Sequence, residues 1–165
     1  MSAQAETRPL IRNHGSAERR WFAGGGVHTW LATASDTAGA FLLCEMEMEQ
    51  GKATPLHTHP ADETLIVLQG ELTLHLAGAE HRVGAGGIAI APAGIPHAFL
   101  VSSGPARMLC LHTPGTCEAF YLGASDPIDS ITTTGIVDFD RVADSARAHG
   151  GIELLGPPPF TASAA

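Results

Sequence analysis

The sequence predicts an all-β fold, a sandwich or barrel of short antiparallel strands, followed by short C-terminal helices. Three observations predict the strands. The 165 residues include 19 glycines and 11 prolines, which supply the tight turns that small all-β folds need. Apolar and polar residues alternate in several short runs, as they do in half-buried strands. Gly and Pro punctuate these runs at intervals of about 8 to 12 residues, the spacing typical of sandwiches and barrels.

The length and composition suit one domain with a genuine hydrophobic core. Hydrophobic residues make up 44% of the chain and charged residues 16%, which is a globular composition. The net charge of -8 and the lack of a Lys/Arg cluster argue against a nucleic-acid partner. No stretch approaches the roughly 20 apolar residues of a membrane-spanning helix. We therefore expect neither a nucleic-acid nor a membrane partner.

The first predicted strand covers residues 27–33, directly after the triple glycine at 24–26. In the next, residues 41–50, the cysteine and methionines alternate with Glu45, Glu47 and Glu49, which predicts a solvated acidic face. Gln69-Gly70 separates two further runs as the turn of a tight hairpin would. The remaining strands are expected at residues 63–68, 71–76, 81–83, 88–91, 97–101 and 106–112.

Two helices are predicted after Pro114-Gly115. Thr116 is a candidate cap for a short helix over residues 117–122. Residues 138–149 form a clearer helix, because Gly150 supplies a C-terminal stop and four residues share one apolar face. Those four residues are Phe139, Val142, Ala143 and Ala146. The sequence thus divides into a flexible N-terminal arm (1–18), a β-barrel domain (19–123) and a helical, Pro-rich extension packed on the barrel (124–165).

The three cysteines, Cys44, Cys110 and Cys117, are odd in number and lack metal-site spacing. A chain of this size needs no disulfide staples, so we expect reduced thiols. The first 20 residues contain no apolar stretch of signal-peptide length. A cytoplasmic location is the prediction.

The most informative residues are three histidines and a glutamate: His57, His59, Glu63 and His97. His57 and His59 are two residues apart, so on a strand both side chains point to the same face. Imidazole and carboxylate ligands suit Fe, Mn, Ni, Co, Cu or Zn as divalent ions, and four protein ligands leave open positions on an octahedral ion. The sequence therefore predicts a site for one divalent transition metal.

These runs resemble the paired motifs of the cupin superfamily. The fixed positions of the first motif are matched by Gly51, His57, His59, Glu63 and Gly70, and those of the second by Gly86, Pro92, Gly94 and His97. The last position of the second motif, usually Asn, is Val101 here. The resemblance implies a cupin (jelly-roll) β-barrel, and the chain from Trp21 to the Pro-rich tail is similar to the quercetin 2,3-dioxygenase-like group of bacterial monocupins.

That group implies a metal-dependent dioxygenase acting on a small aromatic or enolisable substrate, with dioxygen as a second substrate. Glu63 could then be both a metal ligand and the catalytic base that accepts the substrate proton. Two alternatives stay open. One is a metal-dependent isomerase, lyase or cyclase of a small carbonyl compound, and the other is a non-catalytic cupin that binds a small molecule.

Three further residues are candidates for the substrate pocket. Phe99 and Val101 share the face of His97 on a regular strand, and His112 could reach the barrel mouth. His75 is expected to face solvent. The resemblance also implies a homodimer, for which the apolar, Pro-rich end at residues 154–160 is a candidate contact.

Overall fold

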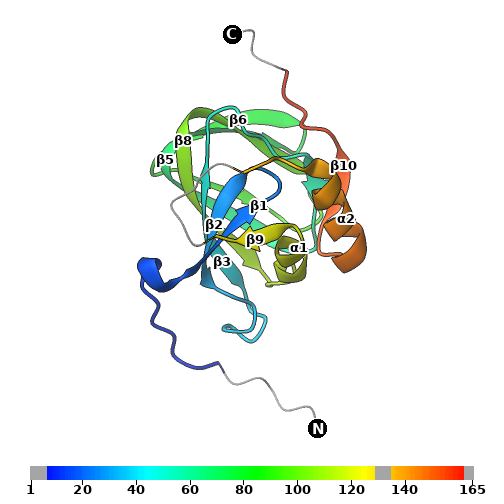
Figure 1. Ribbon diagram of the computed structural model, residues 1–165. Helices are drawn as coiled ribbons and strands as arrows, with labels where there is room; N and C mark the ends of the chain where they lie inside the picture. Colours follow the sequence, from blue (N-terminus) through cyan, green and yellow to red (C-terminus); the bar gives the residue numbers. More distant parts are fainter. Residues whose placement is uncertain (1–6, 129–134, 162–165) are drawn as a thin grey trace.

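The computed structural model describes residues 7–128 and 135–161 (Figure 1). It contains one 3-10 helix, η1 (His14–Ser16), and two α-helices, α1 (Glu118–Gly123) and α2 (Phe139–His149). The strands are β1 (Glu18–Phe22), β2 (Gly26–Ala32), β3 (Leu42–Met48), β4 (Leu56–Thr58), β5 (Asp62–Leu76), β6 (Ala79–Gly84), β7 (Ile88–Ala91), β8 (His97–Thr113), β9 (Ser125–Pro127) and β10 (Glu153–Gly156).

The predicted all-β fold is confirmed. Every pairing among the described strands is antiparallel, and the main path runs β10-β4-β8-β3-β2-β1-β9. Strand β5 lies off this path and pairs with β6, β7 and β8. The strands curl into a jelly-roll barrel whose sheet is not closed, and α1, α2 and β10 gather at one side of it (Figure 1).

The predicted hairpin at Gln69-Gly70 is wrong. β5 continues through both residues and pairs with β8 on either side of them, with register shifts between 67 and 72. Gly70 has φ 80°, and a Cβ there would lie 2.7 Å from the carbonyl oxygen of Pro105. The glycine therefore forms a bulge that lets two backbones approach closely. The tight turn falls later, at Ala77-Gly78, where both residues have positive φ.

Other predicted elements are nearly correct. Helix α2 begins after Asp138, whose side chain accepts a hydrogen bond from the Arg141 N–H, and Gly150 follows its end. Phe139 is exposed, whereas Val142 is buried, so the apolar face is narrower than predicted.

The predicted cap at Thr116 is wrong, because Cys117 occupies the N-cap position of α1 and makes no capping bond through its side chain. Strand β1, before the triple glycine, was not predicted.

The acidic face predicted for residues 41–50 is only partly solvated. Glu45 on β3 is 5% exposed and lies 3.5 Å from the guanidinium of Arg107 and 3.2 Å from His14. Arg12 donates hydrogen bonds to the Leu31 carbonyl and to Asp36. The end of the predicted N-terminal arm is thus held against the sheet, and the first six residues of that arm lie outside the described residues.

No described helix has the length and apolar character to cross a membrane.

Two apolar clusters form the core. One fills the barrel between β3, β5 and β8, with Met108, Leu72 and Val101 at its centre. The other joins Trp30 to Phe120 and Val142, so it ties helices α1 and α2 to the open side of the barrel. The predicted metal ligands lie where these two clusters meet.

Candidate metal centre

Three strands bring the motif residues together. His57 lies in β4, directly opposite His97, the first residue of β8. His59 follows β4, and Glu63 is the second residue of β5. In an antiparallel sheet, opposite residues place their side chains on the same face, so β4 and β8 present two imidazoles to the barrel interior. The residues of the two sequence motifs thus lie next to one another in the barrel.

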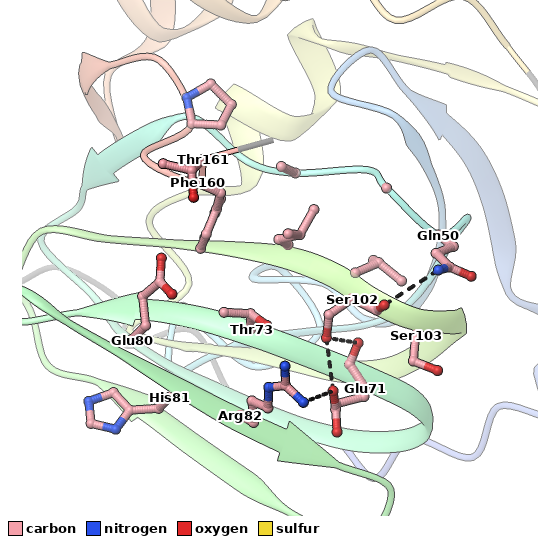
Figure 2. A pocket seen from close by; sticks show the side chains of 15 residues that line it. Gln50, Glu71, Thr73, Glu80, His81, Arg82, Ser102, Ser103, Phe160 and Thr161 are labelled. Carbon is pink, nitrogen blue, oxygen red and sulfur yellow. Dashed lines mark hydrogen bonds and ion pairs between the residues drawn. The ribbon is translucent and has the colours of Figure 1, made fainter. Parts of the chain in front are cut away.

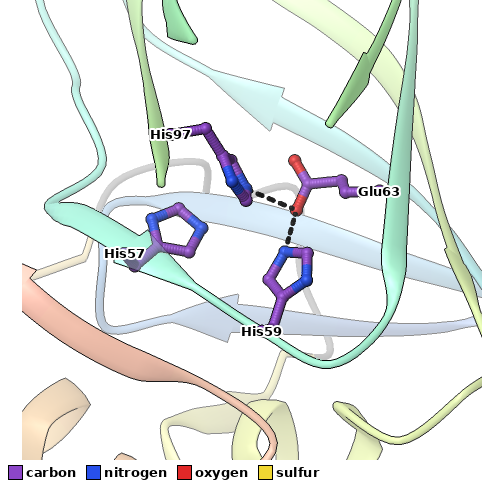
Figure 3. Close-up of side chains that lie close together, drawn as sticks. All are labelled: His57, His59, Glu63 and His97. Atoms are coloured by element: carbon purple, nitrogen blue, oxygen red, sulfur yellow. Dashed lines mark hydrogen bonds and ion pairs between the residues drawn. The ribbon is translucent and has the colours of Figure 1, made fainter. Parts of the chain in front are cut away.

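The four side chains face one another (Figure 3). One donor atom from each of His57, His59, Glu63 and His97 lies within 4.8 Å of all the others, and all four residues are buried. Glu63 Oε2 is 3.1 Å from His59 Nε2 and 3.7 Å from His97 Nε2. Metal–nitrogen bonds are about 2.0–2.1 Å long, so one ion can bridge donors at such separations.

Backbone carbonyls fix the tautomers of the three histidines. Nδ1 of His57 lies 2.8 Å from the Pro55 carbonyl, Nδ1 of His59 lies 2.7 Å from that of Ala61, and Nδ1 of His97 lies 2.8 Å from that of Ile95. A carbonyl can only accept, so each Nδ1–H donates and each Nε2 is left to face the cluster. Nε2 of His97 is buried without a hydrogen-bond partner among the described residues. This arrangement fits a metal ion, since it is how metal-binding histidines are oriented.

The electrostatics agree with that fit. Burial alone would raise the pKa of Glu63, but the hydrogen bond with His59 and the close approach of His97 outweigh it and hold that pKa well below its usual range. Burial, aided by the nearby His97, lowers the pKa of His57 to about 4. Burial also lowers that of His97, but the Glu63 carboxylate outweighs it and raises the His97 pKa overall. An ionised carboxylate and a neutral His57 are ready to bind a metal, whereas the raised pKa of His97 makes protons stronger competitors for that nitrogen.

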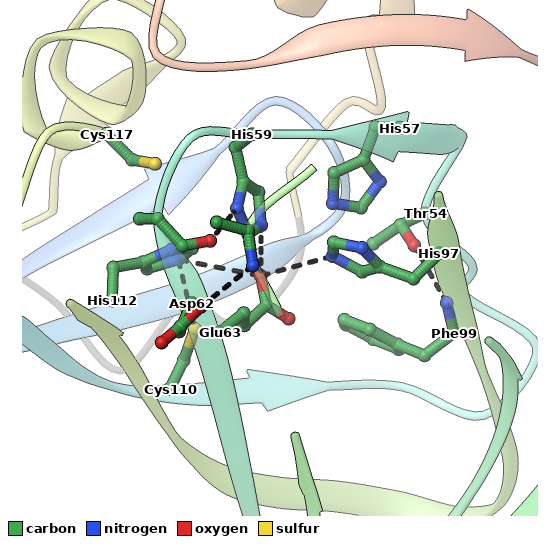
Figure 4. Close-up of polar contacts among 12 residues, drawn as sticks. Thr54, His57, His59, Asp62, Glu63, His97, Phe99, Cys110, His112 and Cys117 are labelled. Carbon is green, nitrogen blue, oxygen red and sulfur yellow. Dashed lines mark hydrogen bonds and ion pairs between the residues drawn. The ribbon is translucent and has the colours of Figure 1, made fainter. Parts of the chain in front are cut away.

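A further group of buried side chains lies around His112, on the other side of Glu63 from His97 (Figure 4). His112 Nε2 lies 3.6 Å from Glu63 Oε2, 3.1 Å from the Tyr121 hydroxyl and 3.3 Å from Cys110 Sγ. Burial lowers the pKa of His112 to about 4 and raises that of Tyr121 well above its usual value. A hydrogen bond with Cys44, together with burial, raises the pKa of Cys110 well above its usual value. All three groups are therefore neutral near pH 7. His112 was predicted near the site, but Tyr121 was missed because only the fold brings α1 under β8.

A small apolar cavity of about 40 Å³ adjoins His57 and Glu63. Phe99 lines it, whereas Val101 lies farther along β8 in the barrel core. His112 is separated from it by Cys110 and Tyr121, which line the cavity themselves. Sequence reasoning also missed the wall formed from the C-terminal extension, by Val142, Ile152 and Leu154. That Phe99, Val101 and His112 contact a substrate stays a prediction.

A much larger groove, of about 1070 Å³, lies elsewhere, between the β5–β6 hairpin and the C-terminal tail (Figure 2). Gln50, Thr73, Glu80, Ser102 and Phe160 are among its lining residues, and none of the four candidate ligands is. The half-buried side chain of His75 lines neither this groove nor the small cavity. Volume alone does not identify an active site, so we place the chemistry at the buried donors.

Comparisons with known proteins agree with this fold. Residues 44–112 match the family described as the cupin domain. The chain is 31% identical over 129 residues to quercetin 2,3-dioxygenase of Bacillus subtilis strain 168, an alignment that covers 78% of this chain but only 38% of the relative. The chain thus spans less than half of that relative's length.

The chain is also similar to solved structures. A polyketide cyclase from Streptomyces resistomycificus superposes with a TM-score of 0.56 at 24% identity, covering 79% of this chain and 90% of the cyclase. A sugar phosphate isomerase of the cupin superfamily from Silicibacter pomeroyi superposes with a TM-score of 0.53 at 27% identity, covering 63% of this chain and 75% of the isomerase. The fold, the matched domain and the curated relative together show that the chain belongs to the cupin superfamily.

Proposed function

We propose that this cupin binds one divalent transition metal through His57, His59, Glu63 and His97 and is an enzyme. The observation that carries the proposal is the orientation of the imidazoles: three Nδ1–H groups bonded to carbonyls leave three Nε2 atoms facing one buried carboxylate. A purely structural role for such a cluster would leave the buried Nε2 of His97 without a hydrogen bond among the described residues, which is costly. The ligand types admit Fe, Mn, Ni, Co, Cu or Zn.

The leading activity is that of a dioxygenase-type oxidoreductase acting on a small aromatic or enolisable substrate. The name of the curated relative, quercetin 2,3-dioxygenase, supports this reaction class. The metal would supply a Lewis acid for the oxygen atoms of the substrate. Glu63 borders the cavity beside His57, so its carboxylate lies where it can accept the proton of an enol. The apolar walls would exclude bulk water from that proton transfer.

An isomerase, lyase or cyclase that needs no oxygen is the second candidate, and the similarity to a sugar phosphate isomerase at 27% identity favours it. The same metal would then polarise a carbonyl while Glu63 moves a proton. The third candidate, a cupin that only binds a small molecule, keeps the cluster and lacks turnover.

The first experiment is elemental mass spectrometry on untagged protein purified without chelator or metal-affinity resin. Close to one equivalent of iron, manganese, nickel, cobalt or copper supports the dioxygenase, and oxygen uptake with small enols and phenols is then measured. Zinc, with turnover under nitrogen, supports the isomerase or lyase. Failure to bind any of these metals on reconstitution excludes both enzyme classes.

We further propose that the protein is a homodimer and that its interface is the outer face of the barrel sheet. Ile66 of β5 lies opposite Ile88 of β7 and Leu109 of β8, and all three point away from the barrel core. Ile88 and Ile90 are 58% and 54% exposed. The continuous apolar set is Leu43, Ile66, Leu68, Ile88, Ile90, Leu109 and Leu111.

A second copy is the occupant that fits this face best. A contiguous apolar patch on a sheet face marks an interaction site. Its rim carries both charge signs, with the exposed Arg107 and the half-buried pair of Arg19 and Glu47. Two copies related by a two-fold axis can therefore place opposite charges against each other around the apolar centre.

A cytoplasmic location stays our proposal, and the three cysteines, all free, are compatible with it.

A further inference from the structure

The cavity beside the candidate metal ligands is far too small for a multi-ring substrate. It measures about 40 Å³, whereas sites for drug-sized ligands measure about 300 Å³ or more. A cavity needs about 10–15 Å³ of such volume to hold one water, so this cavity has room for only a few heavy atoms. The substrate of this site must therefore be small, or the wall of the cavity must be absent when it binds.

The wall that limits the cavity comes from the C-terminal extension. Ile152 and Leu154 line it together with Val142 of helix α2. Leu154 lies opposite His57 in the β10–β4 pairing, which places this side chain next to a candidate ligand. Glu153 and Leu155 between and after them are exposed, as the alternation of a strand requires.

This wall is built into the fold. Cys117 Sγ lies 3.2 Å from the Gly151 carbonyl, just before β10. Ser145 of α2 donates a 2.7 Å hydrogen bond to the Phe120 carbonyl of α1. Ile152 and Leu154 pack against the buried cluster that contains Phe120. The segment that carries the wall is thus anchored by hydrogen bonds and apolar packing on both of its sides.

The cavity also lacks the charges that a phosphorylated substrate needs. Its lining contains neither Lys nor Arg, and Thr54, His57, Glu63 and Tyr121 supply its hydroxyl, imidazole and carboxylate groups. Phosphate groups in proteins are ordinarily met by Arg, Lys or the N-terminus of a helix. A small substrate with one metal-binding oxygen group and a short apolar remainder fits these walls.

We propose that Ile152 and Leu154 determine the substrate size: the site takes a small, unphosphorylated enol or hydroxy-carbonyl compound and excludes three-ring flavonols. This inference rests on the proposed metal site and narrows its substrate class. It also separates this chain from the substrate named for its curated relative.

Three probes of graded size test the proposal on the full chain loaded with cobalt(II), under nitrogen so that no oxidation occurs. They are azide, maltol and 3-hydroxyflavone, and the last two carry the same hydroxy-ketone group on one and three rings. Binding is followed through the visible absorption of cobalt(II). We expect azide to bind the wild type and 3-hydroxyflavone to leave its spectrum unchanged. Maltol should bind the wild type, but more weakly than it binds a variant with an enlarged cavity.

Leu154→Ala enlarges the cavity, and we expect it to tighten 3-hydroxyflavone binding at least tenfold, maltol binding by a smaller factor and azide binding not at all. Leu155→Ala is the matched control, because Leu155 is the next residue and points to solvent. Leu154→Val serves if the alanine variant melts early. Equal binding of 3-hydroxyflavone and maltol by the wild type, or the same gain in both alanine variants, overturns the proposal.

The cobalt content, measured before any probe is added, keeps the two proposals apart. Protein that takes up no cobalt contradicts the proposed metal site. The cavity is then tested in metal-free protein through the fluorescence of 3-hydroxyflavone, where Leu154→Ala but not Leu155→Ala must gain binding. Absence of that difference overturns the size limit independently of the metal.

Discussion

His112 Nε2 lies 3.6 Å from Glu63 Oε2, on the side of the carboxylate that faces away from His97 (Figure 4). His112 is 0% exposed, and its other ring nitrogen has no hydrogen-bond partner among the described residues. The interaction of His112 with Glu63 helps to keep the Glu63 pKa low. His112 is thus placed to hold the Glu63 carboxylate in position for a metal.

We expect His112→Phe, which keeps a ring in this buried place, to weaken metal binding by about 10- to 100-fold, the usual effect of losing a group that orients a ligand. Competition between the protein and a chelator for cobalt(II) measures the change, and thermal melting of the metal-free variant checks the fold. Affinity within a factor of two of the wild type would contradict a positioning role for His112.

Glu63→Gln tests the ligand set itself. The amide is nearly isosteric with the carboxylate but carries no charge, so we expect the retained metal to fall at least tenfold and proton transfer to be lost. Elemental mass spectrometry after dialysis gives the metal content. His75→Ala is the control, since half-buried His75 lies outside the cluster and should keep full metal content. Equal losses in the two variants would mean that these four residues are not the ligands.

Local pattern was enough to pick out the four candidate ligands that the structure brings together. His57, His59 and Glu63 lie within seven consecutive residues, and His97 begins β8 after a Pro/Gly turn, so short-range spacing determines how each reaches the barrel. Leu154 and Tyr121 could not be assigned in this way. Leu154 reaches the site only through the pairing of β10 with β4, which is far away in sequence. Tyr121 follows β8 closely, but its hydroxyl meets His112 only because of the way helix α1 packs back against that strand.

The error at Gly70 has the same cause. A Gln-Gly pair between two alternating runs predicts a turn from local chemistry. The structure instead uses the missing side chain of Gly70 to admit the backbone of Ser103 and Pro105 from β8. That approach involves residues more than 30 positions away, and no local rule detects it.

Gly70→Ala should therefore destabilise the protein far more than Gly78→Ala. Both glycines have φ near 80°, so an alanine at either site costs about 1–2 kcal/mol of backbone strain. At Gly78 a Cβ would meet no atom within 4 Å, whereas at Gly70 it would meet three backbone atoms within 2.9 Å. We expect an extra loss of about 1–3 kcal/mol at Gly70 from this overpacking, measured by urea unfolding. Equal losses would show that the bulge relaxes freely.

The proposed interface predicts the oligomeric state of charged variants. Light scattering after size exclusion should give a dimer for the wild type and a monomer for Ile88→Lys/Ile90→Lys, because two lysines in a desolvated apolar contact are costly. Leu155→Lys should stay dimeric, as Leu155 belongs to the C-terminal end that the sequence suggested as an alternative contact. The reverse pattern would move the interface to that end.

His28 predicts part of the acid sensitivity of the fold. It is 1% exposed, stacks on Phe22 with ring centroids 4.8 Å apart, and has no partner for Nε2 among the described residues. Burial, with a smaller contribution from His112, lowers the His28 pKa to about 3. The unfolded chain therefore binds a proton near pH 6.5 that the folded chain refuses until about pH 3. Stability from this residue is complete above pH 6.5 and is lost as the pH falls through that window.

The loss approaches about 1.4 kcal/mol per pH unit for one such histidine. His28→Phe keeps the aromatic stack and removes the titration, so the free energy of unfolding of this variant should fall less steeply between pH 6 and about pH 4. Metal-free protein is used for both chains, and His57 and His112, whose pKa values are also lowered, contribute equally to both. Parallel pH profiles for the wild type and His28→Phe would mean that His28 becomes protonated without unfolding, through an opening of the Phe22 and Tyr121 rings that cover it.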